Sequence, residues 1–507
     1  YFMPGPSPLL APTLHRMKDD VLDAGLDQVA AWIRQYFEHP ERYRVMPPVA
    51  PGEIAASLPE EAPEEGAGID EILADFERII VPGTTHWNHP RFFAYFATSA
   101  APAGIAAEAL AATLDVKAML WRTSPAATEL EEVTMRWLAR LLELPASWTG
   151  VIYDTASIAG FTALAAAREA LPLRIRELGM TGRDLPVLRV YITAETHSHV
   201  EKAAIALGVG QHNVVRVACD DAYRMRPDAL RAAIAADRER GMQPLAVVAT
   251  VGTTSTTSID PVHAIADVAS EQSVWLHVDA AYAGTAALIP EFRPMLDGVE
   301  LADSLVLNPH KWMFVPMDLS VLFLKDESIV RRAFSVVPEY LTTPEEGVVN
   351  YMDYGLQLGR RFRALKLWFV MRHFGVSGIR QRLRRHIELA QEFASWVRAH
   401  PGWEVLAPHP LSVVCFRYAP AGLDEAGHDA INAELLRAAN ATGEIFLSHT
   451  KVDGRYALRL AIGNLRTQRD DVEFAWRLLR SEAERAQQAL DSHVKETRHY
   501  ILDASDD

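Results

Sequence analysis

The strongest constraint on the fold is a long alternation of short apolar runs with helical stretches rich in Ala and Leu, between about residues 101 and 370. The runs are nearly continuous in Val, Leu and Ile, which is typical of strands buried on both faces. They fall at Val187–Thr193, Val214–Val217, Leu245–Val251, Val274–Asp279 and Ser304–Leu307. Such strands, separated by helices, predict an α/β domain whose mostly parallel sheet is covered on both faces.

The segments before and after this region follow other patterns. A helix predicted over Val21–Phe37 gathers its apolar residues on one face, which we expect to dock onto the rest of the chain or a second subunit. A helix over Ile379–Ala399 leads into strand-like Ser412–Tyr418 and Tyr456–Ile462, which predicts an α+β domain. The expected parts are an N-terminal helical segment (1–100), a large domain (101–370), a small domain (371–485) and a polar tail (486–507).

Composition excludes several classes of function. A formal net charge of −16 argues against a nucleic-acid partner, because phosphate binding needs basic patches. No apolar run approaches the length that crosses a bilayer, so no membrane span is expected. The two cysteines, Cys219 and Cys415, lie in apolar runs and provide neither a disulfide framework nor a metal cluster. A reduced, cytoplasmic setting fits best.

One of the eight lysines stands in an unusual neighbourhood. Lys311 follows a predicted strand and is surrounded by apolar and aromatic residues in LVLNPHKWMFV. Loss of hydration there would lower its pKa and free the amine to attack an aldehyde. A structural lysine that extends to solvent or pairs with Asp303 or Asp318 explains this segment equally well.

A carboxylate and a possible anion site accompany this lysine. Asp279 ends the run VWLHVD, and the end of a parallel strand points into the crevice where α/β proteins bind ligands. In a site that binds a cofactor with a pyridine ring, this carboxylate could pair with the ring nitrogen. An Asp at a strand end also commonly caps a turn without any ligand. The segment Val151–Ser157 leads into a helix whose first N–H groups would bind an anion. Ser and Thr there cap helices without any ligand too.

His197 follows the strand Val187–Thr193 and could stack on a flat cofactor ring. With His199 two residues later, a metal pair is the rival interpretation. No third ligand of suitable type lies nearby, so we expect no metal site.

Four motifs together resemble the group II decarboxylases that depend on pyridoxal 5′-phosphate (PLP), above all those acting on aromatic L-amino acids. They are HVDAAYAG (277–284), NPHKW (308–312), PEYL (338–341) and LGRRFRALKLWF (358–369). The resemblance runs from about Asp20 to Leu479. It implies the fold type I, aspartate-aminotransferase-like architecture and a homodimer with active sites at the subunit interface.

The resemblance also implies residue roles. Lys311 would bond to the cofactor aldehyde, Asp279 would pair with the pyridine nitrogen, and Tyr340, on a mobile loop, would protonate the substrate carbon. The other implied cofactor contacts are His197, Ala281, Thr250, Ala156, Ser157, Asn308 and His310. The implied substrate pocket comprises Trp87, Tyr95, Phe96, Thr98 and Gly359. By the same resemblance, a glycine at position 359 favours indolic substrates.

Three alternatives remain at this point. A glutamate or cysteine-sulfinate decarboxylase would need a cation facing the distal carboxylate, such as Arg91, Lys117 or Arg122. An aromatic aldehyde synthase would carry Phe where Tyr340 stands, and a non-catalytic dimeric scaffold would not need the intact set of site residues. The expected reaction is decarboxylation of Trp, 5-hydroxytryptophan, Tyr, DOPA or Phe to the arylalkylamine and CO2.

Overall fold

The computed structural model describes residues 24–336, 341 and 345–503, with side chains up to residue 488. The chain divides into two compact units, the first ending at His89 and the second beginning at Pro90. In the first unit, the aromatic face of α1 packs within the unit, where Trp32 lies edge-on to Phe76 at 5.0 Å between ring centroids. Its helices are α1 (Leu26–Glu38), α2 (Glu53–Ala56) and α3 (Ile69–Asp75). The predicted helix is therefore confirmed from Leu26 onward, while its beginning lies outside the described residues.

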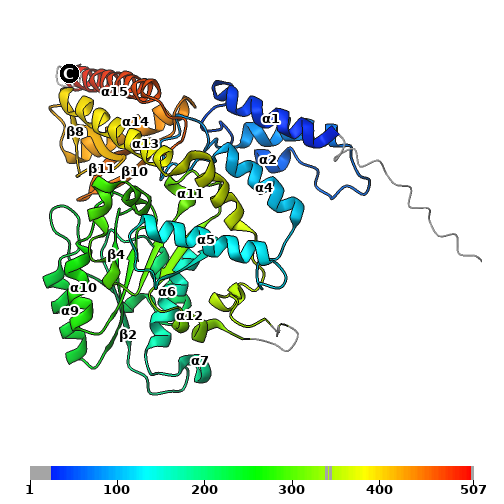
Figure 1. Cartoon of the computed structure of the whole chain (residues 1–507). Coiled ribbons are helices and arrows are strands. Elements are labelled where there is room, and N and C mark those ends of the chain that lie inside the picture. Colours follow the sequence, from blue (N-terminus) through cyan, green and yellow to red (C-terminus); the bar gives the residue numbers. More distant parts are fainter. Residues whose placement is uncertain (1–23, 337–340, 342–344, 504–507) are drawn as a thin grey trace, which may run out of the picture. The chain divides into compact units, whose positions relative to one another are not determined.

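The second unit is built on a seven-stranded sheet of order β1-β7-β6-β5-β4-β2-β3 (Figure 1). All five predicted strands are found in it, and their pairings β2–β3, β2–β4, β4–β5 and β5–β6 are parallel. Two strands that were not predicted, β1 and β7, pair antiparallel with each other, and β7 also pairs antiparallel with β6. The strands are β1 (Thr149–Tyr153), β2 (Leu188–Ile192), β3 (Val214–Arg216), β4 (Gln243–Thr250), β5 (Trp275–Asp279), β6 (Ser304–Leu307) and β7 (Ser320–Leu324).

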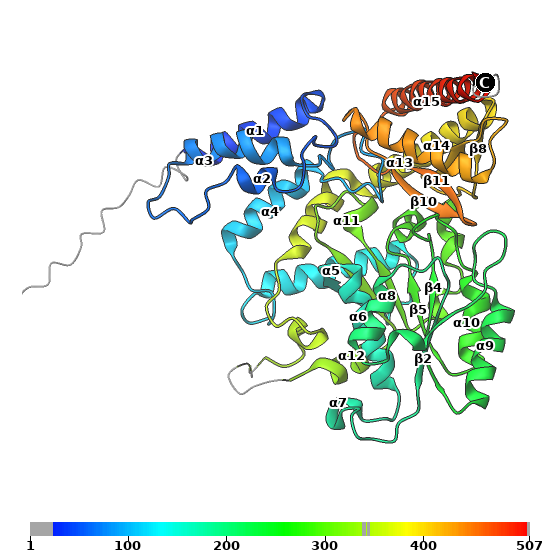
Figure 2. The ribbon, with the colours of Figure 1, turned by 180° about the vertical axis from the view of Figure 1, so that it is seen from behind.

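Both faces of this sheet are buried, as the apolar runs predict. Along β4, Val247 and Ala249 belong to one hydrophobic core, while Ala246 and Val248 belong to another on the opposite face. The first core includes α5 (Pro125–Leu141), α9 (Pro227–Glu239), α10 (Val262–Glu271) and α13 (Arg363–Ala399). The second includes α6 (Ala156–Ala170), α8 (His199–Ala206) and α12 (Glu327–Phe334), and Figure 2 shows the same layers from behind. The remaining helices of this region are α4 (Pro102–Leu114), α7 (Ile175–Leu178) and α11 (Pro309–Trp312).

A second, four-stranded antiparallel sheet of order β10-β11-β9-β8 forms the core of the C-terminal region. Its strands are β8 (Trp403–Val405), β9 (Val413–Tyr418), β10 (Ser448–Val452) and β11 (Arg455–Ala461). It packs with α14 (Glu425–Ala441), α15 (Arg469–Asp503) and the second half of α13. The helix predicted over Ile379–Ala399 is part of α13, which is interrupted at Gly375 by a left-handed φ of 62°. Glycine adopts that conformation without steric cost, which lets the chain turn from the large sheet to the small one.

The parallel strands place their C-terminal ends side by side. β4 ends at Thr250, β5 at Asp279 and β6 at Leu307, and the chain leaves β2 toward His197. A crevice at this edge is where open α/β sheets bind ligands. Among the described helices, none is both long and apolar enough to cross a membrane.

Candidate active site

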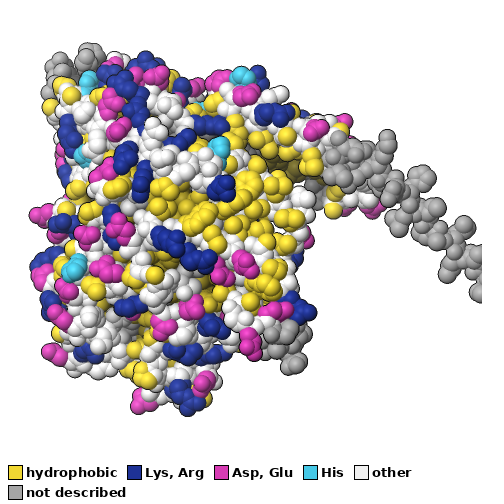
Figure 3. Space-filling view, viewed as in Figure 1, with side chains coloured by type: hydrophobic (Ala, Val, Ile, Leu, Met, Phe, Trp, Pro, Cys, Tyr) yellow, Lys and Arg dark blue, Asp and Glu magenta, His cyan; other side chains and the backbone are white. Residues whose placement is uncertain are grey.

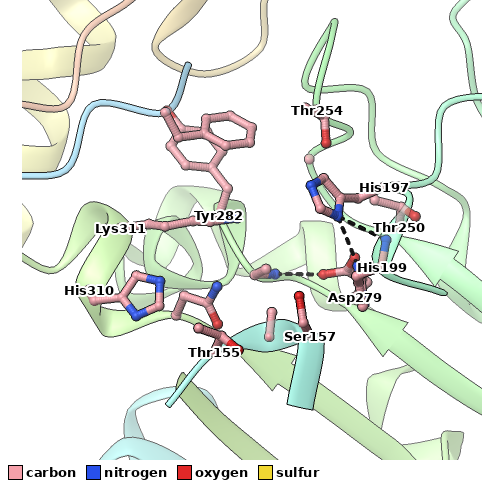
Figure 4. Close-up of a pocket in the computed structure, with 15 residues that line it drawn as sticks. Thr155, Ser157, His197, His199, Thr250, Thr254, Asp279, Tyr282, His310 and Lys311 are labelled. Carbon is pink, nitrogen blue, oxygen red and sulfur yellow. Dashed lines mark hydrogen bonds between the residues drawn. The ribbon is translucent and has the colours of Figure 1, made fainter. Parts of the chain in front are cut away.

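A pocket opens at the C-terminal edge of the parallel strands, with about 620 Å³ of space not filled by protein atoms (Figure 4). All of its lining belongs to the second unit and brings together ten residues that the sequence predicted: Phe96, Ala156, Ser157, His197, Thr250, Asp279, Ala281, Asn308, His310 and Lys311. It also includes Thr155, His199, Gly252, Thr254 and Tyr282.

Lys311 lies in the short helix α11 and is half-buried at the pocket wall. Burial lowers the pKa of its amine, a shift that Asp279 opposes. The structural alternative does not hold, because Asp303 accepts the N–H of Leu276 and Asp318 binds Arg363. A lowered pKa favours the neutral form of the Lys311 amine, which is the form that can act as a nucleophile.

Asp279 lies at the end of β5 and is 4% exposed. Burial raises the pKa of its carboxyl, but the neighbouring His199 and Lys311 lower it, and the net pKa is below the ordinary value. One carboxylate oxygen accepts the N–H of Ala281 at 3.0 Å (Figure 4). A buried, ionised carboxylate at this place can hold a proton on a basic ligand nitrogen.

The first turn of α6 lines the pocket and can serve as an anion cradle. The Thr155 side chain does not cap the helix, because its hydroxyl donates to Asp154 at 3.1 Å. The N–H groups of the first turn have no partners within a helix, and the N-terminus of a helix favours negative charge. Ala156 and Ser157 line the pocket here, with Ser157 exposed toward it.

Asn308 and His310 complete this wall. The side-chain oxygen of Asn308 accepts the Ser320 hydroxyl at 2.6 Å, which leaves its amide to donate elsewhere. Nδ1 of His310 accepts the N–H of Leu319 at 2.9 Å, so the ring proton is on Nε2. Burial lowers the pKa of His310 to about 4, and the ring is a neutral N–H donor at neutral pH.

His197 follows β2 and lines the pocket, with its Nδ1 3.1 Å from Nδ1 of His199 (Figure 4). Burial is the main cause that lowers the pKa of His197. The part of the chain that the structure describes contains no group of three or more His, Cys, Asp or Glu residues arranged to hold a metal ion.

A stack of three aromatic rings lies beside Lys311. Phe96 stacks on Tyr282 at 4.0 Å between ring centroids, and Tyr282 stacks on Trp312 at 4.7 Å. Nζ of Lys311 is 5.0 Å from the centroid of Phe96, and the guanidinium of Arg459 is 4.8 Å from it. The sequence predicted Phe96 but not Tyr282, whose stacking partners are distant along the chain.

Arg459 is a second residue that sequence reasoning missed. It lies in β11, is 3% exposed and donates through Nε to the Ser255 carbonyl at 3.2 Å. Its Nη2 is buried and has no hydrogen-bond partner among the described residues. A buried cation inside an otherwise apolar strand, YALRLAIG, was the available signal.

Several residues predicted for the substrate pocket lie elsewhere in the structure. Tyr95 and Gly359 are exposed, Thr98 is partly buried, and none of the three lines the pocket. Trp87 belongs to the first unit and is 39% exposed. Tyr340 lies outside the described residues.

The site can be tested against a cofactor that carries an aldehyde, a basic ring nitrogen and a phosphate. Lys311 provides an amine for the aldehyde, Asp279 a carboxylate for the nitrogen, and the first turn of α6 N–H donors for the phosphate. These donors fit PLP, which has all three groups. Fold and site together define the class of α/β enzymes that depend on PLP.

Comparisons with known proteins agree with this class. Residues 51–419 match the model of the "Pyridoxal-dependent decarboxylase conserved domain". The chain is 40% identical over 469 residues to tyrosine decarboxylase 2 of Arabidopsis thaliana, covering 90% of this chain and 85% of that protein. It is 39% identical over 474 residues to phenylacetaldehyde synthase of a Rosa hybrid cultivar, covering 90% and 92%. The crystal structure of Oryza sativa TDC with PLP and tryptamine superimposes with a TM-score of 0.89 at 36% identity, covering 93% of this chain and 99% of that one.

The chain therefore belongs to the family of pyridoxal-dependent decarboxylases. The family confirms the predicted cofactor, the enzyme class and the fold type I architecture. The enzyme class of the family argues against the alternative of a non-catalytic scaffold.

Proposed function

We propose that this protein decarboxylates an aromatic L-amino acid to the corresponding arylalkylamine and CO2. The observation that carries the proposal is the stacked pair of Phe96 and Tyr282, which lines the pocket beside Lys311, because aromatic side chains at the reactive amine favour a substrate with an aromatic side chain. The similar proteins support it, since they include a tyrosine decarboxylase, a phenylacetaldehyde synthase and a crystal structure with PLP and tryptamine.

The protein's own residues would act as follows. Lys311 would hold the cofactor through its aldehyde group, and Asp279 would keep the ring nitrogen protonated. His197 would pack on the cofactor ring, while Ser157, Asn308 and His310 would donate hydrogen bonds to the phosphate. The chemistry that bound PLP would supply is an acceptor for the electron pair left at the substrate's α-carbon when CO2 departs.

The direct test is amine release by the purified enzyme from Phe, Tyr, DOPA, Trp, 5-hydroxytryptophan and Glu, each with PLP present. We expect at least one aromatic substrate to exceed Glu by orders of magnitude, because an apolar wall offers no compensation for a second carboxylate. Comparable rates with Glu would contradict the proposal.

The cations considered for an acidic substrate are engaged elsewhere. Arg91 pairs with Glu444 and Asp471, Lys117 with Asp115, and Arg122 with Glu345. Arg459 is the buried cation beside Phe96, so the Glu arm of the panel also tests whether it recognises a second carboxylate.

An aromatic aldehyde synthase is the other candidate, and the similarity to a phenylacetaldehyde synthase supports it. The expected discriminator is Tyr340, which would return a proton to the substrate's α-carbon and so direct the reaction to the amine. The assay therefore measures aldehyde and hydrogen peroxide beside the amine. The amine as the dominant product supports the decarboxylase.

We further propose a cytoplasmic homodimer with the four-part domain organisation given above. Figure 3 shows hydrophobic side chains gathered over the region in which Figure 1 draws α4. Leu110 and Leu114 of α4 are 49% and 59% exposed, and Met317 is 66% exposed. Single chains rarely expose so many large apolar side chains, and a second copy would cover them. Sedimentation analysis tests the dimer.

A further inference from the structure

Two imidazole rings lie one behind the other at the pocket wall. His197 is exposed toward the pocket, whereas His199, the first residue of α8, is 3% exposed. The proposed function uses His197 and leaves His199 without a role. The contacts of His199 nevertheless determine where the protons of His197 lie.

The main-chain N–H of His199 donates to Nδ1 of His197 at 3.2 Å. A main-chain N–H can only donate, so Nδ1 of His197 carries a lone pair and the ring proton is on Nε2. Nδ1 of His199 lies 3.1 Å from the same atom and must carry a proton, because two lone pairs would otherwise face each other. Figure 4 shows both contacts converging on one nitrogen of His197, with the other ring nitrogen turned away from His199.

We propose that His199 is a positioning residue that keeps His197 neutral, with its single proton on Nε2. A second proton on His197 would have to enter at Nδ1, where it would break both hydrogen bonds and face two N–H groups. The inference rests on the proposed function only for its catalytic consequence, because the arrangement of the two rings is a property of the protein alone.

The position of His199 is fixed from its other side by Gly160 of α6. A Cβ added at Gly160 would lie 2.7 Å from Nε2 of His199, closer than real Cβ atoms come to other atoms. That Nε2 is buried and has no hydrogen-bond partner in the described part of the chain. No competing bond turns the ring, and His199 directs its one ring hydrogen bond to His197.

The charged groups around the pair favour the same protonation state. Burial lowers the pKa of His199 to about 4, against the pull of Asp279, so this ring is neutral at neutral pH. For His197, burial is joined by Lys311 and Lys202 in lowering the pKa, and Asp279 raises it. His277, which faces Asp279 from β5, also has its pKa lowered to about 4 by burial.

A neutral His197 would leave undisturbed the interaction of Asp279 with a protonated ring nitrogen. An imidazolium packed against the cofactor ring would repel the positive charge that Asp279 holds on the ring nitrogen. His199 would therefore preserve cofactor binding at mildly acidic pH by holding back the protonation of His197.

The test compares His199→Leu with His199→Asn. Leu retains the bulk that shields His197 but loses the side-chain N–H, whereas the Asn amide can place an N–H near the position of Nδ1. Histidine is labelled with ¹³C, the His197 signal of the cofactor-free protein is assigned by its loss in His197→Asn, and its titration midpoint is measured by NMR. Loss of one hydrogen bond to the neutral form should raise the midpoint by about one pH unit in His199→Leu, and His199→Asn should remain near the parent.

The dissociation constant of PLP, measured against pH, should begin to rise at a higher pH in His199→Leu than in the parent. An unchanged His197 midpoint in His199→Leu would overturn the proposal. Should that variant fail to fold, Gly160→Ala displaces the ring while keeping His199, and an unchanged midpoint there would overturn it too. His277→Asn is the control, and an equal shift in it would attribute the effect to general solvation and reject a specific role of His199. Failure of the amine assay in the parent would leave these midpoints unaffected, so the two proposals fail separately.

Discussion

Replacement of Asp279 by Asn separates the charge of this side chain from its shape. One oxygen of Asp279 accepts the N–H of Ala281 at 3.0 Å, and the Asn carbonyl can keep that bond. The second oxygen remains for a ligand in the pocket, and in Asn an NH2 group takes its place. The variant should therefore retain the backbone geometry at the end of β5 and lose the negative charge that would stabilise a protonated ring nitrogen.

The magnitude follows from the burial of the side chain. At 4% exposure, solvent cannot replace the lost charge. A hydrogen bond to a charged group contributes about 1.5–3 kcal/mol, so the affinity for PLP should fall about 10- to 150-fold in Asp279→Asn. Amine release at saturating PLP should fall as well, because an unprotonated ring is a weaker acceptor of electrons.

The assay is equilibrium titration of the cofactor-free protein with PLP, followed by absorbance. Asp303→Asn is the matched control, since Asp303 accepts the N–H of Leu276 at 2.8 Å near the opposite end of β5 and does not line the pocket. The control should bind PLP like the parent. Equal affinities of the parent and Asp279→Asn would refute the assignment of Asp279 to the ring nitrogen.

Three further predictions concern the lysine, the loop tyrosine and stability in acid. Borohydride should fix the cofactor on Lys311, as peptide mapping would show, and Lys311→Ala should lose nearly all amine release; a label on another lysine contradicts the assignment. Tyr340→Phe should still release CO2 but shift its product from amine toward aldehyde with peroxide, whereas unchanged amine formation would place the proton donor elsewhere. Burial lowers the pKa of His386 from 6.5 to about 4. The unfolded chain then takes up a proton that the folded chain does not, and the free energy of unfolding should fall as the pH drops through this window. Urea unfolding should show a shallower fall in His386→Asn, and an identical slope would contradict the cause.

The sheet could be predicted from the sequence where its signal is local. Val274–Asp279 and Leu245–Val251 are continuous apolar runs, and runs of that kind indicate strands buried on both faces whatever their partners are. β7, with the sequence SVLFL, has the same composition but follows directly on the lysine segment and was missed. Its antiparallel pairing with β1 joins segments far apart in the chain, and no local pattern encodes that choice.

The site was predictable to the same extent. Residues at or just after strand ends, such as Asp279 and Lys311, meet in the pocket because parallel strands end at one edge. The role inferred for His199 depends on the space left by Gly160, on another helix, and could not be predicted. Lys366 shows the opposite error. The sequence predicts a solvated lysine there, but Lys366 is 1% exposed and pairs with Glu108.

A buried ion pair between Arg360 and Glu131 stabilises β1, the strand that leads into the anion cradle of α6. Arg360 is 7% exposed and donates to Glu131 at 2.6 Å and to the carbonyl of Ile152 in β1 at 2.7 Å, and β1 leads directly into α6. Glu131→Gln would leave the guanidinium buried without its counter-charge, which costs about 3–5 kcal/mol. Glu132→Gln, on the same helix, removes a pair at 3.5 Å whose Arg136 is 58% exposed, and should cost at most about 1 kcal/mol. Urea unfolding of both variants measures the difference; if they lose equal stability, the buried pair does not support β1 and the cradle that follows it.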